Sequence, residues 1–207
     1  MMSRLEIPIE IWQSLSPQQR LQRLSRPVKA QSATLRKTVT EILSDVRDNG
    51  EKAVLKYTCR FDYPEANSLQ LKDEQVKTAI ASLDENVKSA IDTAYETIYS
   101  FHKEQLPQNL SIETAPGVQC ELRFTPLQAV GLYIPGGTAT LPSTALMLGI
   151  PAQIAGCQRV IMASPPNKHG LLPAALIYAA KRCDVSDILL CGGAQAIGTS
   201  KQGSKQR

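Results

Sequence analysis

Two glycine-rich turns hold the residues whose types and spacing could do chemistry. The first turn, PGG at 135–137, follows Tyr133, and the second, CGG at 191–193, precedes Gln195. A turn that leaves a strand and enters a helix exposes backbone N–H groups at the helix N-terminus, where they suit a phosphate or another anion. Tyr133 would add a flat ring and a hydroxyl, and Gln195 an amide that both donates and accepts hydrogen bonds. The pattern indicates a ligand crevice, but it also fits plain tight turns with Tyr133 as a core aromatic.

Three buried strands and the helices between them would position these turns. The apolar runs that indicate strands lie at 129–134, 159–163 and 187–190. The patterns that indicate helices lie at about 142–155, at 171–182 and from Gly193 onward. Short connections between alternating strands and helices require right-handed crossovers and a parallel sheet. The predicted fold class is therefore α/β, an open parallel sheet with helices on both faces and an incomplete Rossmann-like topology, preceded by a helical N-terminal region. The carboxyl ends of the strands share one edge, where open α/β sheets bind ligands.

The first part of the chain is predicted to be mainly helical. Helices are expected at about 9–24 and 32–48, followed by one or two helical turns around Tyr57. Apolar residues at steps of three and four from Val76 to Phe101 predict one long helix, with Asp73 as its N-cap. Alternating apolar residues at 118–124 predict a half-exposed strand.

These elements divide the chain into four expected parts. They are an N-terminal helical segment at 1–29, a helical region with a long helix and a strand at 30–125, a partial Rossmann-like domain at 126–198, and a disordered basic tail at 199–207. The tail contains three cations and no acid, so the rest of the chain is close to neutral although the net charge is +4. The composition therefore predicts no nucleic-acid partner.

Other function classes find little support in the composition. No apolar run is long enough for a membrane span, and the N-terminus lacks the apolar core of a secretory signal. Five scattered cysteines without a CxxC pair favour reduced thiols and a cytoplasmic protein. His102 and His169 belong to no metal-binding motif, and Cys157 and Cys191 suit buried positions better than nucleophile roles. We predict no catalytic residue and no metal ligand in this chain.

The residues of the two turns resemble histidinol dehydrogenase. The resemblance rests on GLYIPGGTATLPSTALMLGIPAQIAGC at 131–157, SPP at 164–166 and GGAQAIG at 192–198. It extends upstream through DVRDNGEKAVLKYTCRFD at 45–62 and FHKEQ at 101–105, and so covers nearly all of 32–198. These motifs are specific to the family.

The resemblance implies an activity and a set of cofactors. Enzymes of this family oxidise L-histidinol to L-histidine through an aldehyde, with two hydride transfers to NAD, and they are zinc-dependent homodimers. Their contacts to NAD include the tyrosine before PGG and the glutamine of GGAQ, which are Tyr133 and Gln195 in this sequence. A third contact, the asparagine of a GPGN motif, is not present here.

The resemblance also predicts what this chain lacks. In the family the zinc ligands, the catalytic Glu-His pair and most substrate contacts follow beyond the GGAQAIG motif, so we expect this polypeptide alone not to turn over histidinol. Two alternatives stay open: a catalytically dead module that keeps the NAD crevice or a dimer surface, and a non-functional frameshifted fragment. An unpaired edge on the last strand and an uncovered stripe on the long helix would favour self-association.

Overall fold

A computed structural model describes residues 9–25, 33–137 and 141–202, in two compact units, Met1–Lys37 and Thr38–Arg207. In the first unit a short 3-10 turn, η1 (Trp12–Ser14), precedes α1 (Pro17–Leu24). Ser16 caps α1, because its hydroxyl accepts from the N–H of Gln19 while the Gln19 side chain accepts from the N–H of Ser16. The single helix predicted at 9–24 is therefore interrupted by a cap.

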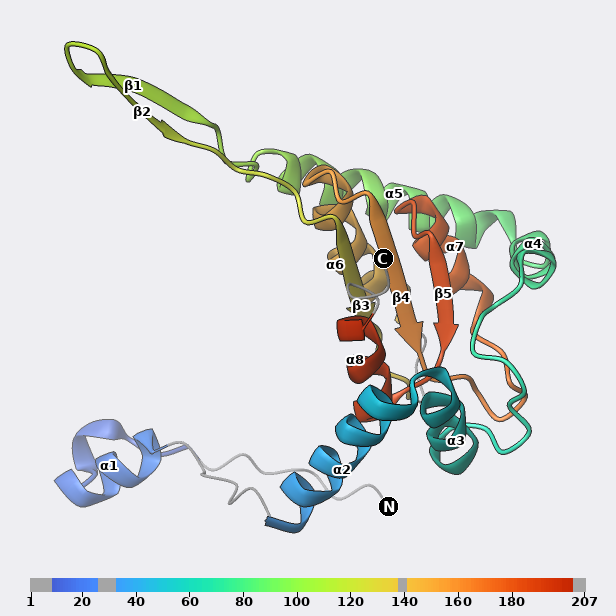
Figure 1. The fold of residues 1–207 in the computed structure, drawn as a ribbon. Helices are drawn as coiled ribbons and strands as arrows, with labels where there is room; N and C mark the ends of the chain where they lie inside the picture. The colour runs from blue at the N-terminus through green and yellow to red at the C-terminus, as the bar shows by residue number, and fades with distance from the viewer. Residues whose placement is uncertain (1–8, 26–32, 138–140, 203–207) are drawn as a thin grey trace. The chain divides into compact units, whose positions relative to one another are not determined.

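The second unit contains the predicted parallel sheet. Strands β3 (Ala129–Tyr133), β4 (Arg159–Ser164) and β5 (Asp187–Leu190) pair in the order β3-β4-β5, all parallel (Figure 1). The intervening helices are α6 (Pro142–Ile154), α7 (Ala174–Arg182) and α8 (Gly193–Gln202). The predicted fold class is confirmed.

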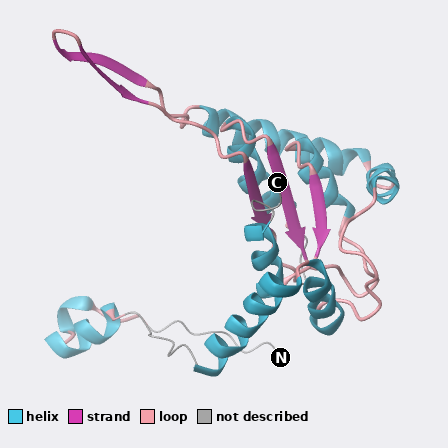
Figure 2. Cartoon of the chain, in the orientation of Figure 1, coloured by secondary structure: helices cyan, strands magenta, loops and turns pink. Residues whose placement is uncertain are grey.

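Helices cover both faces of this sheet (Figure 2). Alternate residues of the central strand belong to separate core clusters: Val160 and Met162 pack with α5, α6 and α7, whereas Ala163 packs with α2, α3 and α8. Side chains of consecutive strand residues point to opposite faces, so a strand buried on both faces is apolar throughout. This explains the continuous apolar runs in the sequence.

Helices α2 (Ala33–Asn49) and α3 (Glu51–Phe61) confirm the predicted helical segments. Gly50 separates them with a positive φ of 56°, a conformation that favours glycine. Ile42 and Val46 of α2 are buried, as are Val54 and Tyr57 of α3. The end of α3 is thereby brought to the sheet, which matters for the site below.

The single long helix predicted from Asp73 is wrong. The structure has two helices, α4 (Asp73–Ala81) and α5 (Glu85–Lys103). Asp84 caps α5, with its carboxylate accepting from the N–H of Asn86 at 2.8 Å. Asp73 is the first residue of α4 rather than its N-cap, a position that Lys72 takes. The apolar stripe is partly covered, since Ile91 and Tyr95 are buried against α6 and α7.

An exposed β-hairpin follows α5. Its strands β1 (Leu110–Ala115) and β2 (Val118–Leu122) pair antiparallel, and every residue from 103 to 129 is exposed. The strand predicted to be half-exposed is thus fully exposed, and its partner β1 was not predicted. Opposed residues share a face, so Leu110 and Leu122 lie on one side and Ser111 and Glu121 on the other.

The outer edge of β5 is paired, which corrects the expectation of an unpaired last strand. Gln70 forms an antiparallel bridge with Leu189. The N–H of Leu71 donates to the carbonyl of Ile188 at 3.0 Å, and the N–H of Leu190 donates to the carbonyl of Leu69 at 2.6 Å. The segment before α4 therefore pairs with this edge of the sheet.

The C-terminal helix α8 runs to Gln202. The first four residues of the expected disordered tail are accordingly helical, and 203–207 lie outside the described residues. The four-part division of the chain stays a prediction. In the described part of the chain no helix is long and apolar enough to cross a membrane.

Candidate functional site

A cleft of about 530 Å³ lies at the carboxyl ends of the three strands. Residues from the turns after β3 and β4, including 135–137 and 164–167, line it together with Gly193 from the turn after β5. Phe61 and Asp62 at the end of α3 complete the lining. The volume is typical of small-molecule sites, and the position is the one where open α/β sheets bind ligands.

Close approach of the turns explains their glycines. A Cβ at Gly136 would lie 2.4 Å from Cγ of Pro165, in the neighbouring turn. Gly193 has a φ of 59°, and a Cβ there would lie 2.8 Å from Oε1 of Gln195. No other residue type fits either position without displacing its neighbour, so the glycines allow the turns to approach each other.

Tyr133 ends β3 and lines the cleft, as the sequence predicted. Its hydroxyl oxygen accepts a hydrogen bond from the N–H of Gly193 at 3.3 Å. This bond joins the turn after β5 to the end of β3. Since Tyr133 is only partly buried, the rest of its ring stays accessible from the cleft.

Gln195 lies behind the lining rather than in it. The residue is 2% exposed, and its Nε2 donates to Oδ2 of Asp62 at 3.2 Å. Its Oε1 faces Gly193, the same residue that contacts Tyr133. The structure therefore brings the two predicted residues together around Gly193, but only Tyr133 borders the cleft.

Asp62 is the side chain that sequence reasoning missed. Its Oδ2 accepts from the N–H of Gly192 at 2.9 Å as well as from Gln195. Burial raises the pKa of this carboxyl, while the hydrogen bonds from Gly192 and Gln195 lower it in part. Because 130 residues separate Asp62 from Gly192, no local spacing could reveal the contact.

None of the other candidate groups, Cys191, His102 and His169, lines the cleft. Burial, with a smaller effect of the Asp62 charge, raises the pKa of Cys191 to about 12, so the thiol is not a nucleophile at neutral pH. Nδ1 of His102 hydrogen-bonds Oε1 of Gln105 at the end of α5. His169 borders a different, polar cavity. No group of three or more potential metal-ligating side chains occurs among the described residues.

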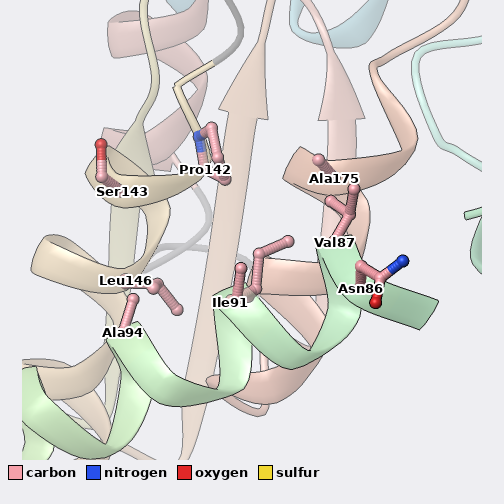
Figure 3. A pocket seen from close by; sticks show the side chains of 9 residues that line it. Asn86, Val87, Ile91, Ala94, Pro142, Ser143, Leu146 and Ala175 are labelled. Atoms are coloured by element: carbon pink, nitrogen blue, oxygen red, sulfur yellow. The ribbon is translucent and has the colours of Figure 1, made fainter. Parts of the chain in front are cut away.

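A second cavity, of about 430 Å³, lies between α5, α6 and the start of α7 (Figure 3). Ile91, Ala94 and Leu146 give it an apolar wall, and the polar atoms of Asn86 and Ser143 point away from these side chains. No titratable side chain lines it. This cavity is suited to apolar packing rather than to catalysis.

Comparisons with known proteins place the cleft in a family context. Residues 25–206 match the family model for histidinol dehydrogenase. The chain is 72% identical to a histidinol dehydrogenase of Idiomarina loihiensis over 98% of its length, and 45% identical to one of Colwellia psychrerythraea over 94%. It spans 46% and 45% of those proteins. A crystal structure of histidinol dehydrogenase from Elizabethkingia anophelis matches with a TM-score of 0.75 and 36% identity, over 79% of this chain and 38% of that one.

Proposed function

Because this chain belongs to the histidinol dehydrogenase family, we propose that its cleft binds NAD for the oxidation of L-histidinol to L-histidine. The observation that carries the proposal is the convergence of three strand-end turns on one cleft, with Tyr133 in its lining and Gly193 held beside it. When bound, NAD supplies the hydride acceptor. The chain's own residues bind and orient it.

The lining fits a dinucleotide chemically. Pro165, Pro166 and Leu141 offer apolar walls for flat rings, whereas Asn167 offers a polar side chain for hydroxyl and phosphate groups. Gly193 at the start of α8 also lines the cleft, and a helix N-terminus favours an anion, although the N–H groups of Gly192 and Gly193 already donate to Asp62 and Tyr133. Tyr133 and Gln195 stay the proposed cofactor-binding residues. We propose that Tyr133 contacts the cofactor directly and that Gln195 supports the Gly193 turn, which contacts it.

The described residues do not fit the zinc site that the family implies. They hold no cluster of three or more His, Cys, Asp or Glu side chains, and the whole sequence has only two histidines. Zinc sites need three or four such ligands. We propose that these 207 residues supply the NAD cleft and do not by themselves oxidise histidinol. The homodimer and the cytoplasmic setting implied by the resemblance stay predictions.

Calorimetric titration of the purified chain with NAD tests this proposal. We expect saturable binding at millimolar NAD or below, and at least a tenfold weaker affinity for Tyr133→Ala. No binding at millimolar NAD would refute the proposed cleft. An assay with zinc, NAD and histidinol should show no NADH formation, and clear turnover would overturn the assignment of catalysis to residues outside this sequence.

A catalytically dead binding module is the second candidate, and the formed cleft favours it over a non-functional fragment. Mixing the chain with a full-length histidinol dehydrogenase would distinguish the two. A module for dimerisation should co-elute with the full-length subunit, whereas a fragment without function should neither co-elute nor bind NAD.

A further inference from the structure

The carboxylate of Asp62 lies where separate parts of the cleft meet. Asp62 directly follows α3, and one of its oxygens, Oδ2, accepts hydrogen bonds from both Gly192 and Gln195. Gly192 lies in the connection between β5 and α8, and Gln195 lies in the first turn of α8. A single carboxylate oxygen thus ties the end of α3 to the turn that carries Gly193.

This contact determines which way the Gln195 amide is turned. An ionised carboxylate accepts hydrogen bonds and cannot donate, so the NH₂ side of Gln195 has to face Asp62. The carbonyl oxygen then faces Gly193: a Cβ on Gly193 would lie 2.8 Å from Oε1 but 3.5 Å from Nε2. A reversed amide would set its oxygen against the carboxylate, and like partial charges would repel.

Gly193 transmits this arrangement to the cleft. A Cβ on Gly193 would collide with Oε1 of Gln195, so the glycine lies close against that amide, and its N–H reaches the hydroxyl of Tyr133 in the lining. Fixing the amide of Gln195 therefore also fixes the turn and its bond to Tyr133. Tyr133 of β3, Asp62 after α3 and Gln195 of α8 are thus connected through these bonds and the backbone of Gly192 and Gly193.

We propose that Asp62 is a positioning residue, which holds the Gln195 amide and the Gly192–Gly193 turn in the orientation that the cleft needs for its cofactor. The effect on NAD rests on the proposed function, whereas the effect on Gln195 does not. Asp62 touches no reacting atom in this scheme and acts through the turn.

The groups around Asp62 allow its protonation to be followed without interference from a neighbouring titration. Cys191 interacts electrostatically with it, and the thiol stays protonated below neutral pH because burial raises its pKa. Tyr133 borders the same cleft. No Lys, Arg or His side chain pairs with Asp62 in the described part of the chain. A change near Gln195 in mild acid would therefore report Asp62.

Nuclear magnetic resonance of the Gln195 side-chain NH₂ tests the positioning itself, without NAD. Its signal is identified by its absence in Gln195→Ala. We expect it to shift on acidification with a midpoint above the ordinary aspartate pKa of about 3.9, because burial raises the pKa of Asp62. In Asp62→Asn the pH-dependent shift should vanish. A Gln195 signal that changes neither on acidification nor in Asp62→Asn would refute the proposal. If Asp62→Asn misfolds, the titration of the unsubstituted chain alone decides.

NAD affinity tests the consequence for the cleft. Asp62→Asn should raise the Kd for NAD about tenfold, as expected for loss of a hydrogen bond to a charged group. Asp187→Asn is the matched control, because Asp187 also accepts from a glutamine amide, that of Gln70 at 3.1 Å, but at the amino end of β5. Its Kd should change less than twofold.

The outcomes separate the two proposals. If the unsubstituted chain fails to bind NAD, the proposed function fails and the Gln195 signal still decides the role of Asp62. If NAD binds equally well to the chain and to a folded Asp62→Asn variant, Asp62 does not position the cleft.

Discussion

The hydroxyl of Tyr133 accepts the N–H of Gly193 at 3.3 Å, and this bond joins the ends of the two outer strands of the sheet across the candidate site. It depends on a backbone conformation at Gly193, with φ at 59°, that side chains rarely tolerate. The geometry of the cleft is thus set by a glycine as much as by the side chains around it.

Gly193→Ala should therefore weaken NAD binding strongly, by more than tenfold, and should lower the free energy of unfolding by about 1–3 kcal/mol. The added Cβ would displace Oε1 of Gln195, 2.8 Å away. Calorimetry and thermal unfolding measure the two effects. Gly50→Ala is the control, since φ is also positive at 56° but no atom lies within 4 Å of a Cβ there. It should lose stability and keep NAD affinity. Equal affinities in both variants would contradict the role of Gly193.

Contact between α6 and α7 predicts a second glycine effect. A Cβ at Gly149 would lie 2.6 Å from Cβ of Cys183, which is fully buried. Gly149→Ala should overpack this contact and lower the free energy of unfolding by about 1–3 kcal/mol. Denaturant titration measures the change. Gly137→Ala has no atom within 4 Å of the new Cβ and should stay within about 0.5 kcal/mol of the unsubstituted chain. A Gly149→Ala variant of unchanged stability would show that α6 and α7 pack more loosely.

The pH dependence of stability should include a contribution from Asp45. Hydrogen bonds from Lys56, then from Asn49 and Tyr57, lower the pKa of its carboxyl from 3.8 to about 2. A group whose pKa is lowered by folding stabilises the folded state above its unfolded pKa, and the contribution is lost as the pH falls toward 2. The stability difference between the chain and Asp45→Asn should accordingly shrink between pH 4 and pH 2. Carbon-detected titration of the Asp45 carboxyl should show its midpoint near pH 2, and a midpoint near 4 would exclude these interactions.

Cysteine reactivity should follow burial. Cys183 and Cys191 are buried, and burial raises the pKa of each to about 12, so almost no thiolate forms at neutral pH. Cys120 lies exposed in the hairpin. An alkylating reagent at pH 7.5 should modify Cys120 first and leave Cys183 and Cys191 intact until the chain is unfolded. Mass spectrometry of the digested protein measures the order, and early labelling of Cys191 would contradict its burial.

The sheet and its helices were predictable because their patterns are local. Val160 and Met162 face one core cluster and Ala163 the other, so the sequence of β4 shows by itself that both faces are buried. The break between α4 and α5 escaped prediction because Leu83, in the connection, still packs on the same core as the helices that flank it. The apolar period continues although the helix does not. Asp84, which caps α5, was the available signal.

The candidate site was predictable only in part. Tyr133 and Gln195 adjoin motifs that mark strand ends, so their approach followed from the strand order. Asp62, at the end of α3, contacts the same turn although it lies 130 positions earlier in the sequence. A single acidic residue at a helix end has no distinctive spacing that would indicate this contact. The hairpin strand β1 was missed for a similar reason. Its alternating Leu110 and Ile112 follow closely on Pro107 and polar residues. This pattern is short and lies just after the predicted long helix, so it did not indicate a strand.

The antiparallel bridge between Gln70 and Leu189 determines at which edge a further strand could be added to the parallel sheet. With the far side of β5 occupied by the chain itself, an incoming strand, whether from the same polypeptide or from another molecule, would extend this three-stranded sheet beside β3, its other edge. The sheet is thus capped at one end and extensible at the other.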